Sequence, residues 1–282
     1  MKQKQRIALF GMVAVALIFA ACDGDSGNNG TEVDGDSSSS ANESSSSEGI
    51  VSSSSLFAVS SSSSWVGSSS SAGAVGISGP LYGEITDTRD GQTYRTVVIG
   101  TQTWMAENLN YADSVAMMNL KGNLWCYGNS ADSCAKYGRL YTWTGAMNMA
   151  SSYQSELASA VISTPQQGVC PAGWHIPTDA EWTTLENAVG GSNTAGTYLK
   201  STNGWYNDGN GTDSYGYSAR PAGFRNNYGD FRSAGLIANF WSASENLASH
   251  AYNRYLNYDY AYMYTHYNNK YFAFSVRCVK DF

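Results

Sequence analysis

Residues 170–182 read CPAGWHIPTDAEW and combine a thiol, a histidine, two carboxylates and two tryptophans. Such a set could hold a metal ion or catalyse a reaction, but its spacing favours a structural role. Thr178 followed three residues later by Glu181 is a capping box, which begins a helix. Asp179 then lies where the helix dipole stabilises negative charge. His175 has no second histidine or nucleophile beside it, so the sequence predicts a structural histidine rather than a catalytic one.

A second stretch, residues 205–213, reads WYNDGNGTD and places several oxygen-bearing side chains at short spacing on a glycine-rich loop. Carboxylate and amide oxygens are the ligands that Ca²⁺ prefers. Asp208, Asn210 and Asp213 are therefore candidate calcium ligands. The loop lacks the glutamate of an EF-hand, and Asn, Asp and Gly are also ordinary turn formers. A bound calcium ion and a plain turn both remain open at this point.

Aromatic residues supply the third candidate site, because the chain has 20 tyrosines and 8 tryptophans. Sugars present C–H faces that stack on aromatic rings, while their hydroxyls bond to Asn, Asp or Glu. Residues 257–265 read NYDYAYMYT, which predicts a strand with its tyrosines on one face. The candidate ligand-binding residues are Trp205, Tyr206, Trp241, Glu245, Tyr258, Tyr260 and Tyr262.

A buried position is the alternative for these aromatic residues. For any single tryptophan the core is the commoner location, and the tyrosine face could equally be core, a protein interface or a binding platform. Core positions are expected for Trp104, Trp125, Trp143, Trp174 and Trp182, and also for the candidate Trp241.

The N-terminal part is predicted to export and tether a folded domain. Basic residues precede an apolar run over 7–21, as in a signal peptide, and small residues before Cys22 resemble a bacterial lipobox. Lipidation of Cys22 is expected, with an ordinary secretory cleavage as the alternative. Residues 22–78 contain five serine blocks, which predicts a disordered tether. We therefore predict a signal peptide over 1–21, a tether over 22–78 and one domain over 79–282, lipid-anchored at the outer membrane or cell surface.

The charge pattern argues against nucleic-acid binding. The net charge is −7, and most of it comes from acidic residues in the predicted tether. The remaining domain is close to neutral and lacks the basic surface expected of a nucleic-acid-binding protein. The chain also contains none of the GxSxG, HExxH, P-loop or dinucleotide-binding motifs. No cofactor other than the possible Ca²⁺ is therefore expected.

Four cysteines follow Cys22, and an even number in an exported chain indicates disulfides. Four cysteines allow three pairings. We predict a short local loop, Cys126–Cys134, and a long connection, Cys170–Cys278, to the C-terminal strand. Zinc binding is the alternative, but the chain lacks CxxC spacing and its three histidines are scattered.

Secondary-structure signals occur along the whole predicted domain. Residues 93–99 and 101–105 predict two strands after the Asp90-Gly91 turn signal. Apolar residues three and four apart predict a short helix over 140–149. The helix that begins at the capping box should end at Gly190-Gly191, and residues 271–279 predict a final strand.

Six sequence motifs occur in a fixed order between residues 83 and 281: GEITDTRDGQTYRTVVIGTQTWMAENLNY, YGRLYTWTGAM, GVCPAGWHIPTDAEWTTLE, GYSARPAGFR, FWSASE and FSVRCVKD. Together they resemble the Fibrobacter succinogenes major paralogous domain, which is similar to the C-type-lectin-like group that includes the formylglycine-generating enzymes. The resemblance implies an α+β domain with two helices, small twisted antiparallel sheets, long loops, and termini brought together by the first and last strands. It carries no agreed activity.

The expected function is that of a cell-envelope lipoprotein displaying a non-catalytic ligand-binding domain. Its ligand would be a polysaccharide or a surface protein, and the membrane would be contacted through the lipid anchor. The alternative is a structural or adhesive envelope component that acts through protein contacts. A third hypothesis is an enzyme related to the formylglycine-generating enzymes, which use a reactive cysteine pair; the predicted disulfides argue against it.

Overall fold

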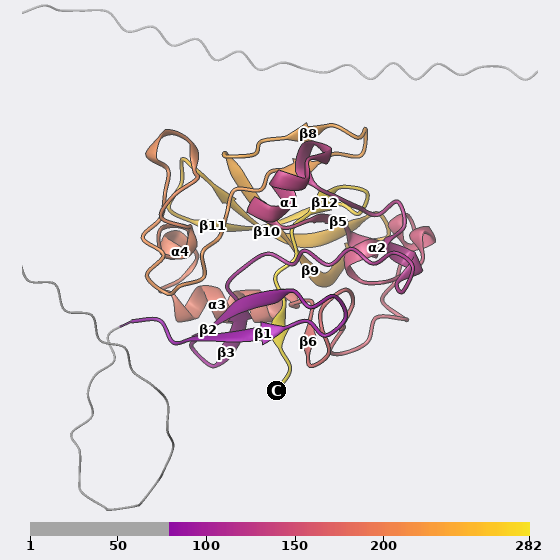
Figure 1. Ribbon diagram of the computed structural model, residues 1–282, viewed down its shortest axis with the longest axis horizontal. Helices are drawn as coiled ribbons and strands as arrows, with labels where there is room; N and C mark the ends of the chain where they lie inside the picture. Colours follow the sequence, from indigo (N-terminus) through magenta and orange to yellow (C-terminus); the bar gives the residue numbers. More distant parts are fainter. Residues whose placement is uncertain (1–78) are drawn as a thin grey trace, which may run out of the picture. The chain divides into compact units, whose positions relative to one another are not determined.

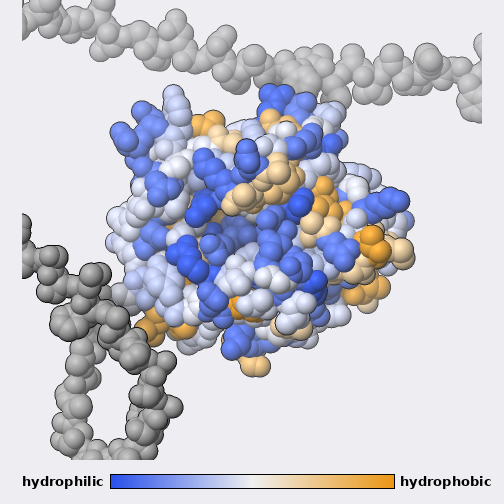
Figure 2. Space-filling model, in the orientation of Figure 1, coloured by the Kyte–Doolittle hydropathy of each residue, from blue (hydrophilic) through white to orange (hydrophobic). Residues whose placement is uncertain are grey.

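The computed structural model describes residues 79–282, and the predicted signal peptide, Cys22 and serine-rich tether lie outside this range. The described residues form an α+β fold of three small antiparallel sheets and four α-helices (Figure 1). Within this range we find no helix with the length and apolar character needed to cross a bilayer. Hydrophilic residues cover most of the face shown in Figure 2, with hydrophobic residues in smaller areas between them.

The first sheet joins the two ends of the described chain. Its strands, in the spatial order β1-β2-β3-β13-β6, are Tyr82–Thr86, Thr93–Ile99, Gln102–Met105, Val279–Lys280 and Trp174–His175. The strands predicted over 93–99 and 101–105 are thus confirmed, as β2 and β3. Figure 1 shows the C-terminus beside this sheet, in agreement with the expectation that the first and last strands bring the termini together, although β13 pairs with β3 and β6 rather than with β1.

The second sheet consists of three consecutive strands in the order β11-β10-β9. Their bounds are Ile237–Leu247 for β9, His250–Asn257 for β10 and Met263–Asn269 for β11. The single strand predicted over 257–265 is wrong, because the chain reverses direction at residues 258–262. Asn257 accepts a hydrogen bond from the Asp259 backbone N–H at 3.1 Å, and this local bond begins the turn.

The third sheet is assembled from five short strands in the order β4-β5-β12-β7-β8. They are Leu124–Trp125, Leu140–Thr142, Ala273–Phe274, Phe224–Arg225 and Phe231–Arg232. The helix predicted over 140–149 is only partly correct, since residues 140–142 pair as β5 before a short helix begins. The strand predicted over 271–279 divides into β12 and β13, which belong to different sheets.

Four α-helices cover these sheets, rather than the two that the resemblance implied. Figure 1 places α4 and α2 at opposite sides of the fold. The helices are α1 Ala131–Tyr137, α2 Trp143–Ala146, α3 Asp179–Ala188 and α4 Ser192–Leu199. Single-turn 3₁₀ helices occur at Met118–Leu120, Tyr127–Asn129, Ser151–Gln154 and Tyr206–Asp208.

Helix α3 begins with the predicted capping box. The Thr178 hydroxyl accepts from the Glu181 backbone N–H, and the Glu181 carboxylate accepts from the Thr178 N–H at 2.8 Å. The buried His175 ring bonds to Glu181 through Nε2 at 2.7 Å and to Asp281 through Nδ1 at 2.6 Å. His175 therefore fixes the start of α3 to the C-terminus, which is the structural role predicted for it.

The core combines tryptophans with two disulfides. Both predicted pairings are present, Cys126–Cys134 and Cys170–Cys278. Of the tryptophans expected in the core, only Trp125 is half-buried, because it lies on the edge strand β4. Those that are buried are Trp104, Trp143, Trp174, Trp182 and Trp241.

Three buried cationic side chains tie the long loops to the core. Arg277 donates to the carbonyls of Met105 and Ser218, and burial lowers the pKa of Arg277 to about 10. Lys270 donates to three carbonyls and to Glu245, and Lys200 donates to three carbonyls. Irregular segments leave backbone carbonyls without strand or helix partners, and these cations supply the missing donors.

Candidate functional site

Two of the predicted ligand-binding tryptophans lie in the core. Trp241 is 0% exposed and Trp205 is 6% exposed. The Trp241 indole donates to the Tyr141 carbonyl at 2.8 Å, and the Trp205 indole donates to the Ala219 carbonyl at 3.1 Å. Their polar atoms are therefore satisfied inside the protein, and neither ring is available as a surface platform.

Glu245 also has a structural position. Its carboxylate accepts a hydrogen bond from the buried Lys270 ammonium and from the backbone N–H groups of Ala158 and Ser159. Its side chain is 5% exposed. These bonds use the oxygen atoms that a sugar hydroxyl would need, so Glu245 holds the loop after Ser151–Gln154 rather than a ligand.

The candidate calcium ligands form turns in the structure. Asn210 accepts from the Trp205 backbone N–H at 3.1 Å, and Asp213 accepts from the backbone N–H and the hydroxyl of Ser218. Burial raises the pKa of Asp213 despite these bonds. Asp208 is exposed on the short Tyr206–Asp208 turn. In residues 79–282 no group of three or more His, Cys, Asp and Glu side chains could hold a metal ion.

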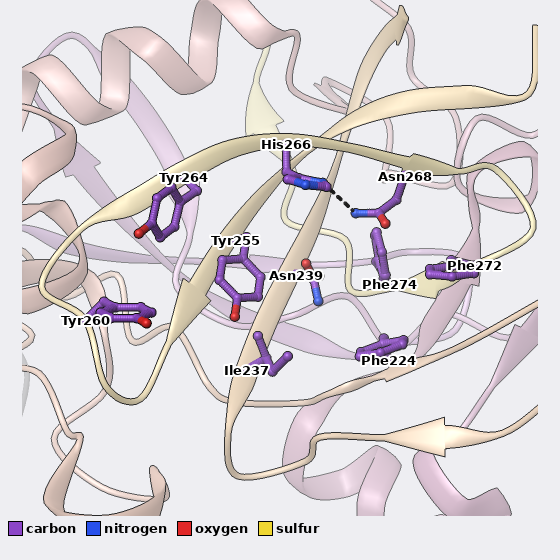
Figure 3. Close-up of a pocket in the computed structure, with 10 residues that line it drawn as sticks. All are labelled: Phe224, Ile237, Asn239, Tyr255, Tyr260, Tyr264, His266, Asn268, Phe272 and Phe274. Atoms are coloured by element: carbon purple, nitrogen blue, oxygen red, sulfur yellow. Dashed lines mark hydrogen bonds between the residues drawn. The ribbon is translucent and has the colours of Figure 1, made fainter. Parts of the chain in front are cut away.

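The structure instead places an aromatic groove on one face of the β9–β10–β11 sheet (Figure 3). The cavity has a volume of about 460 Å³. We call it the groove, and ten residues line it: Phe224, Ile237, Asn239, Tyr255, Tyr260, Tyr264, His266, Asn268, Phe272 and Phe274. Of the residues proposed from the sequence, Tyr260 alone is among them. The Tyr262 ring stacks on that of Tyr260. Tyr258 is half-buried, and the exposed Tyr206 packs edge-on against it.

Strand register brings the lining residues together. Tyr255 of β10 lies opposite Asn239 of β9 on one side and opposite Tyr264 of β11 on the other. Directly opposed residues of an antiparallel sheet project from the same face. Alternate residues of β11, namely Tyr264, His266 and Asn268, therefore point into the groove, as Figure 3 shows.

Tyrosines gather at one end of the groove. The rings of Tyr260 and Tyr262 stack with centroids 4.9 Å apart, and Tyr262 meets Tyr264 edge-on at 4.2 Å. Tyr255 packs against Tyr264 at 5.9 Å. Tyr260 is 41% exposed, so its ring is packed on one side and open to a ligand on the other.

Phenylalanines form the opposite end (Figure 3). Phe224 stacks on Phe272 with a centroid distance of 5.8 Å and an interplanar angle of 15°. Phe274 lies edge-on to both rings and packs on the buried Trp241 at 4.3 Å. This end is anchored to the core, because Phe274 is buried and belongs to β12.

Three asparagines form a hydrogen-bonded series at the floor of the groove, where Asn239 and Asn268 line the cavity and Asn253 is buried beneath it. The Asn268 amide nitrogen donates to the Asn253 side-chain oxygen at 3.0 Å, and the Asn253 nitrogen donates to the Asn239 oxygen at 3.0 Å. Each bond fixes the orientation of the next amide, because one end of the group donates and the other accepts. The series ends at the Asn239 nitrogen, which has no partner among the described residues and faces the groove.

Two further donors reach the groove. The Tyr255 hydroxyl oxygen accepts from the Asn257 amide at 2.6 Å, which leaves the hydroxyl proton free to donate. Burial raises the pKa of Tyr255, so the group stays protonated. His266 Nδ1 lies 3.2 Å from the Asn268 nitrogen, and since an amide nitrogen only donates, the neutral ring carries its proton on Nε2.

Comparison with known proteins settles the family. The family model of the Fibrobacter succinogenes major domain matches residues 97–280, more than half of the chain. The chain belongs to this family. Neither curated proteins nor solved structures give a further match. The family description assigns no activity, so the function has to be argued from the groove.

Most of the groove was not found from the sequence. Phe224, Asn239 and Phe272 lie on three separate segments, and only tertiary packing brings them together. One signal was available, since the alternation of Tyr264, His266 and Asn268 indicates a strand face with polar and aromatic character. The predicted strand ended at residue 265 and missed the last two of them.

Proposed function

We propose that this member of the family is a non-catalytic ligand-binding domain that binds a polysaccharide along the groove. The observation that carries the proposal is the combination of aromatic rings at both ends with uncharged donors between them. Pyranose C–H faces stack on such rings, and ring and hydroxyl oxygens accept from groups such as the Asn239 amide and the Tyr255 hydroxyl.

The composition of the groove favours a neutral sugar and recognition rather than turnover. None of the ten lining residues is a carboxylate, a lysine, an arginine or a cysteine. Hydrolysis of glycosides normally needs two carboxylates. The four domain cysteines are in disulfides, so a reactive thiol pair is not offered either. Calcium is not part of the proposal.

The cellular setting is part of the same proposal. A lipid on Cys22 would anchor the chain, and the serine-rich residues 22–78 would extend the domain from the cell envelope toward the polysaccharide. Globomycin-sensitive processing and metabolic labelling with a fatty acid would test the anchor. A Cys22→Ser chain should then be unlabelled and released from membranes.

Binding can be tested with the full chain in mild detergent. Retention on insoluble polysaccharides and a glycan array would identify the sugar, with and without calcium. Replacing both Tyr260→Ala and Tyr264→Ala should weaken binding about tenfold or more, which corresponds to about 1.4 kcal/mol. Tyr228→Ala is the matched control, because that tyrosine is 87% exposed and outside the groove. The absence of binding to every polysaccharide would reject this function.

A protein partner is the second candidate, favoured by the position of β11 at the edge of its sheet. An edge strand can pair with a strand of another protein. Tyr267 lies on β11 and is 50% exposed. It is opposite Tyr252, which is three residues before the groove residue Tyr255, so Tyr267 and Tyr252 project from the face of the sheet away from the groove. Crosslinking on intact cells that is lost in Tyr267→Lys, with polysaccharide binding unchanged, would favour this alternative.

A further inference from the structure

The turn between β10 and β11, residues 258–262, carries Tyr260, which lines one end of the groove, and Tyr262, which stacks on it. Its backbone carbonyls converge on a single side chain. The Lys200 ammonium donates to the carbonyls of Asn257 at 3.1 Å, Tyr258 at 3.2 Å and Tyr260 at 3.1 Å. Three carbonyls match the three donors of an ammonium group, so the bonding capacity of Lys200 is filled by the turn and by Asn257, which directly precedes it.

The surroundings of Lys200 resemble those of a bound cation more than those of a surface salt bridge. The residue is 4% exposed, and its ammonium lies 5.2 Å from the centre of the Trp205 ring. Asp259 is the acidic residue that acts on it, and this carboxylate is exposed and makes no hydrogen bond to Lys200. The ammonium is therefore held by carbonyl dipoles and an aromatic face.

The same turn packs closely on α4, the helix that Lys200 follows. The Thr197 backbone N–H donates to the Ala261 carbonyl at 3.0 Å. Gly196 lets the two backbones approach, because a Cβ there would be 2.7 Å from the Ala261 oxygen and 2.8 Å from the Tyr262 oxygen. One segment, residues 196–200, thus supplies both the contact surface and the cation.

We propose that Lys200 is a positioning residue: its ammonium acts as an internal cation that holds the turn in the shape that presents Tyr260 to the ligand. No metal ion is then needed to order this part of the groove. The effect of Lys200 on ligand binding rests on the proposed polysaccharide binding. Its effect on the order of the turn rests on the contacts alone.

Hydrogen exchange of the ligand-free full chain tests the order of the turn. Lys200→Met removes the charge and shortens the unbranched side chain by one atom. It should speed exchange in a peptide covering 257–262 about tenfold or more, while a peptide from α3 is unchanged. Lys200→Arg keeps a buried cation and should exchange more slowly than Lys200→Met. Lys121→Met, at an exposed lysine, is the control and should change neither peptide.

Binding supplies the second measurement. Lys200→Met should weaken polysaccharide binding about tenfold, and EDTA should leave binding to the unaltered chain unchanged. If the unaltered chain binds no polysaccharide, the proposed function fails, and hydrogen exchange still decides the role of Lys200. If EDTA abolishes binding and calcium restores it, or if the turn stays protected in Lys200→Met, the internal-cation proposal is overturned.

A second variant covers the case in which Lys200→Met unfolds the whole domain, which faster exchange in α3 would reveal. Gly196→Ala leaves the ammonium in place but pushes the turn away from α4. It should speed exchange over 257–262 and weaken binding, with α3 unchanged. Normal protection of the turn in Gly196→Ala would show that the position of the turn does not depend on residues 196–200.

Discussion

The two faces of the β9–β10–β11 sheet are built from alternate residues of the same strands, yet they have opposite properties. One face is covered by α3 and α4 and buries Phe240, Arg254 and Leu256. The other forms the groove, with Asn239, Tyr255 and Tyr264. The difference lies in what covers each face. Helices pack on the first face and bury its side chains, whereas the second face keeps exposed rings and unpaired hydrogen-bond donors.

Charge follows the same division. Arg254 of the covered face is fully buried, and it bonds to Glu186 at 2.6 Å and to Asp179, both on α3. The groove face has no charged lining residue. Buried charges need partners from the covering helix, so the covered face can hold an arginine, while the open face uses neutral amides and hydroxyls.

Loss of the Arg254 side chain should cause the largest effect. Arg254→Met leaves the carboxylates of Glu186 and Asp179 without their partner, and breaking a buried pair costs about 3–5 kcal/mol. Urea unfolding of the oxidised protein would measure it. The double variant Arg254→Met with Glu186→Leu should recover part of the loss, and failure to recover any would mean that packing rather than charge is responsible.

Asn253→Leu should have the next largest effect, because it alters the groove floor from beneath. The Asn239 oxygen and the Asn268 nitrogen would lose their partners, at a cost of about 1–3 kcal/mol in unfolding free energy. Binding should also weaken, since Asn239 is no longer oriented. Full ligand affinity in a destabilised Asn253→Leu protein would contradict the role given to the asparagine series.

Tyr255→Phe should separate the two faces most sharply, because Tyr255 is the direct neighbour of Arg254. The ring remains, so unfolding free energy should change by less than about 1 kcal/mol, while loss of the hydroxyl should weaken binding by about 0.5–1.5 kcal/mol. Calorimetry beside urea unfolding would measure both. A variant that is strongly destabilised but binds normally would place this hydroxyl in the fold rather than in the site.

The smallest effect should come from the pH dependence of His175, which fixes the start of the covering helix α3. Burial alone would lower the pKa of His175, but its bonds to Glu181 and Asp281 outweigh burial and raise the pKa. A raised pKa means that the protonated histidine stabilises the fold. This stabilisation is fully present below the ordinary pKa of about 6.5 and is lost as pH rises through the higher pKa of the folded state. Unfolding free energy should therefore fall above about pH 6.5, and His175→Gln should remove this slope.

Local sequence signals correctly predicted the elements that are formed by interactions between residues close in sequence. The capping box at Thr178 and Glu181 forms because its two bonds lie within four residues. The strand over 93–99 follows from β-branched and aromatic residues beside a turn signal. The helix predicted over 140–149 was only partly correct, because residues 140–142 pair with strands distant in sequence. The strand predicted over 257–265 was wrong, because a local turn interrupts the alternation of tyrosines.

The sequence by itself determined the family motifs, the four cysteines available for disulfides and the supply of aromatic and amide side chains. Only the tertiary structure decided which aromatic residues are open. Trp205 and Trp241 have the chemistry of ligand-binding residues, yet helices and loops cover them, while Tyr260 and Phe272 border the groove. The physical reason is that a groove is a surface formed by segments distant in sequence, and its exposure depends on the packing of all of them.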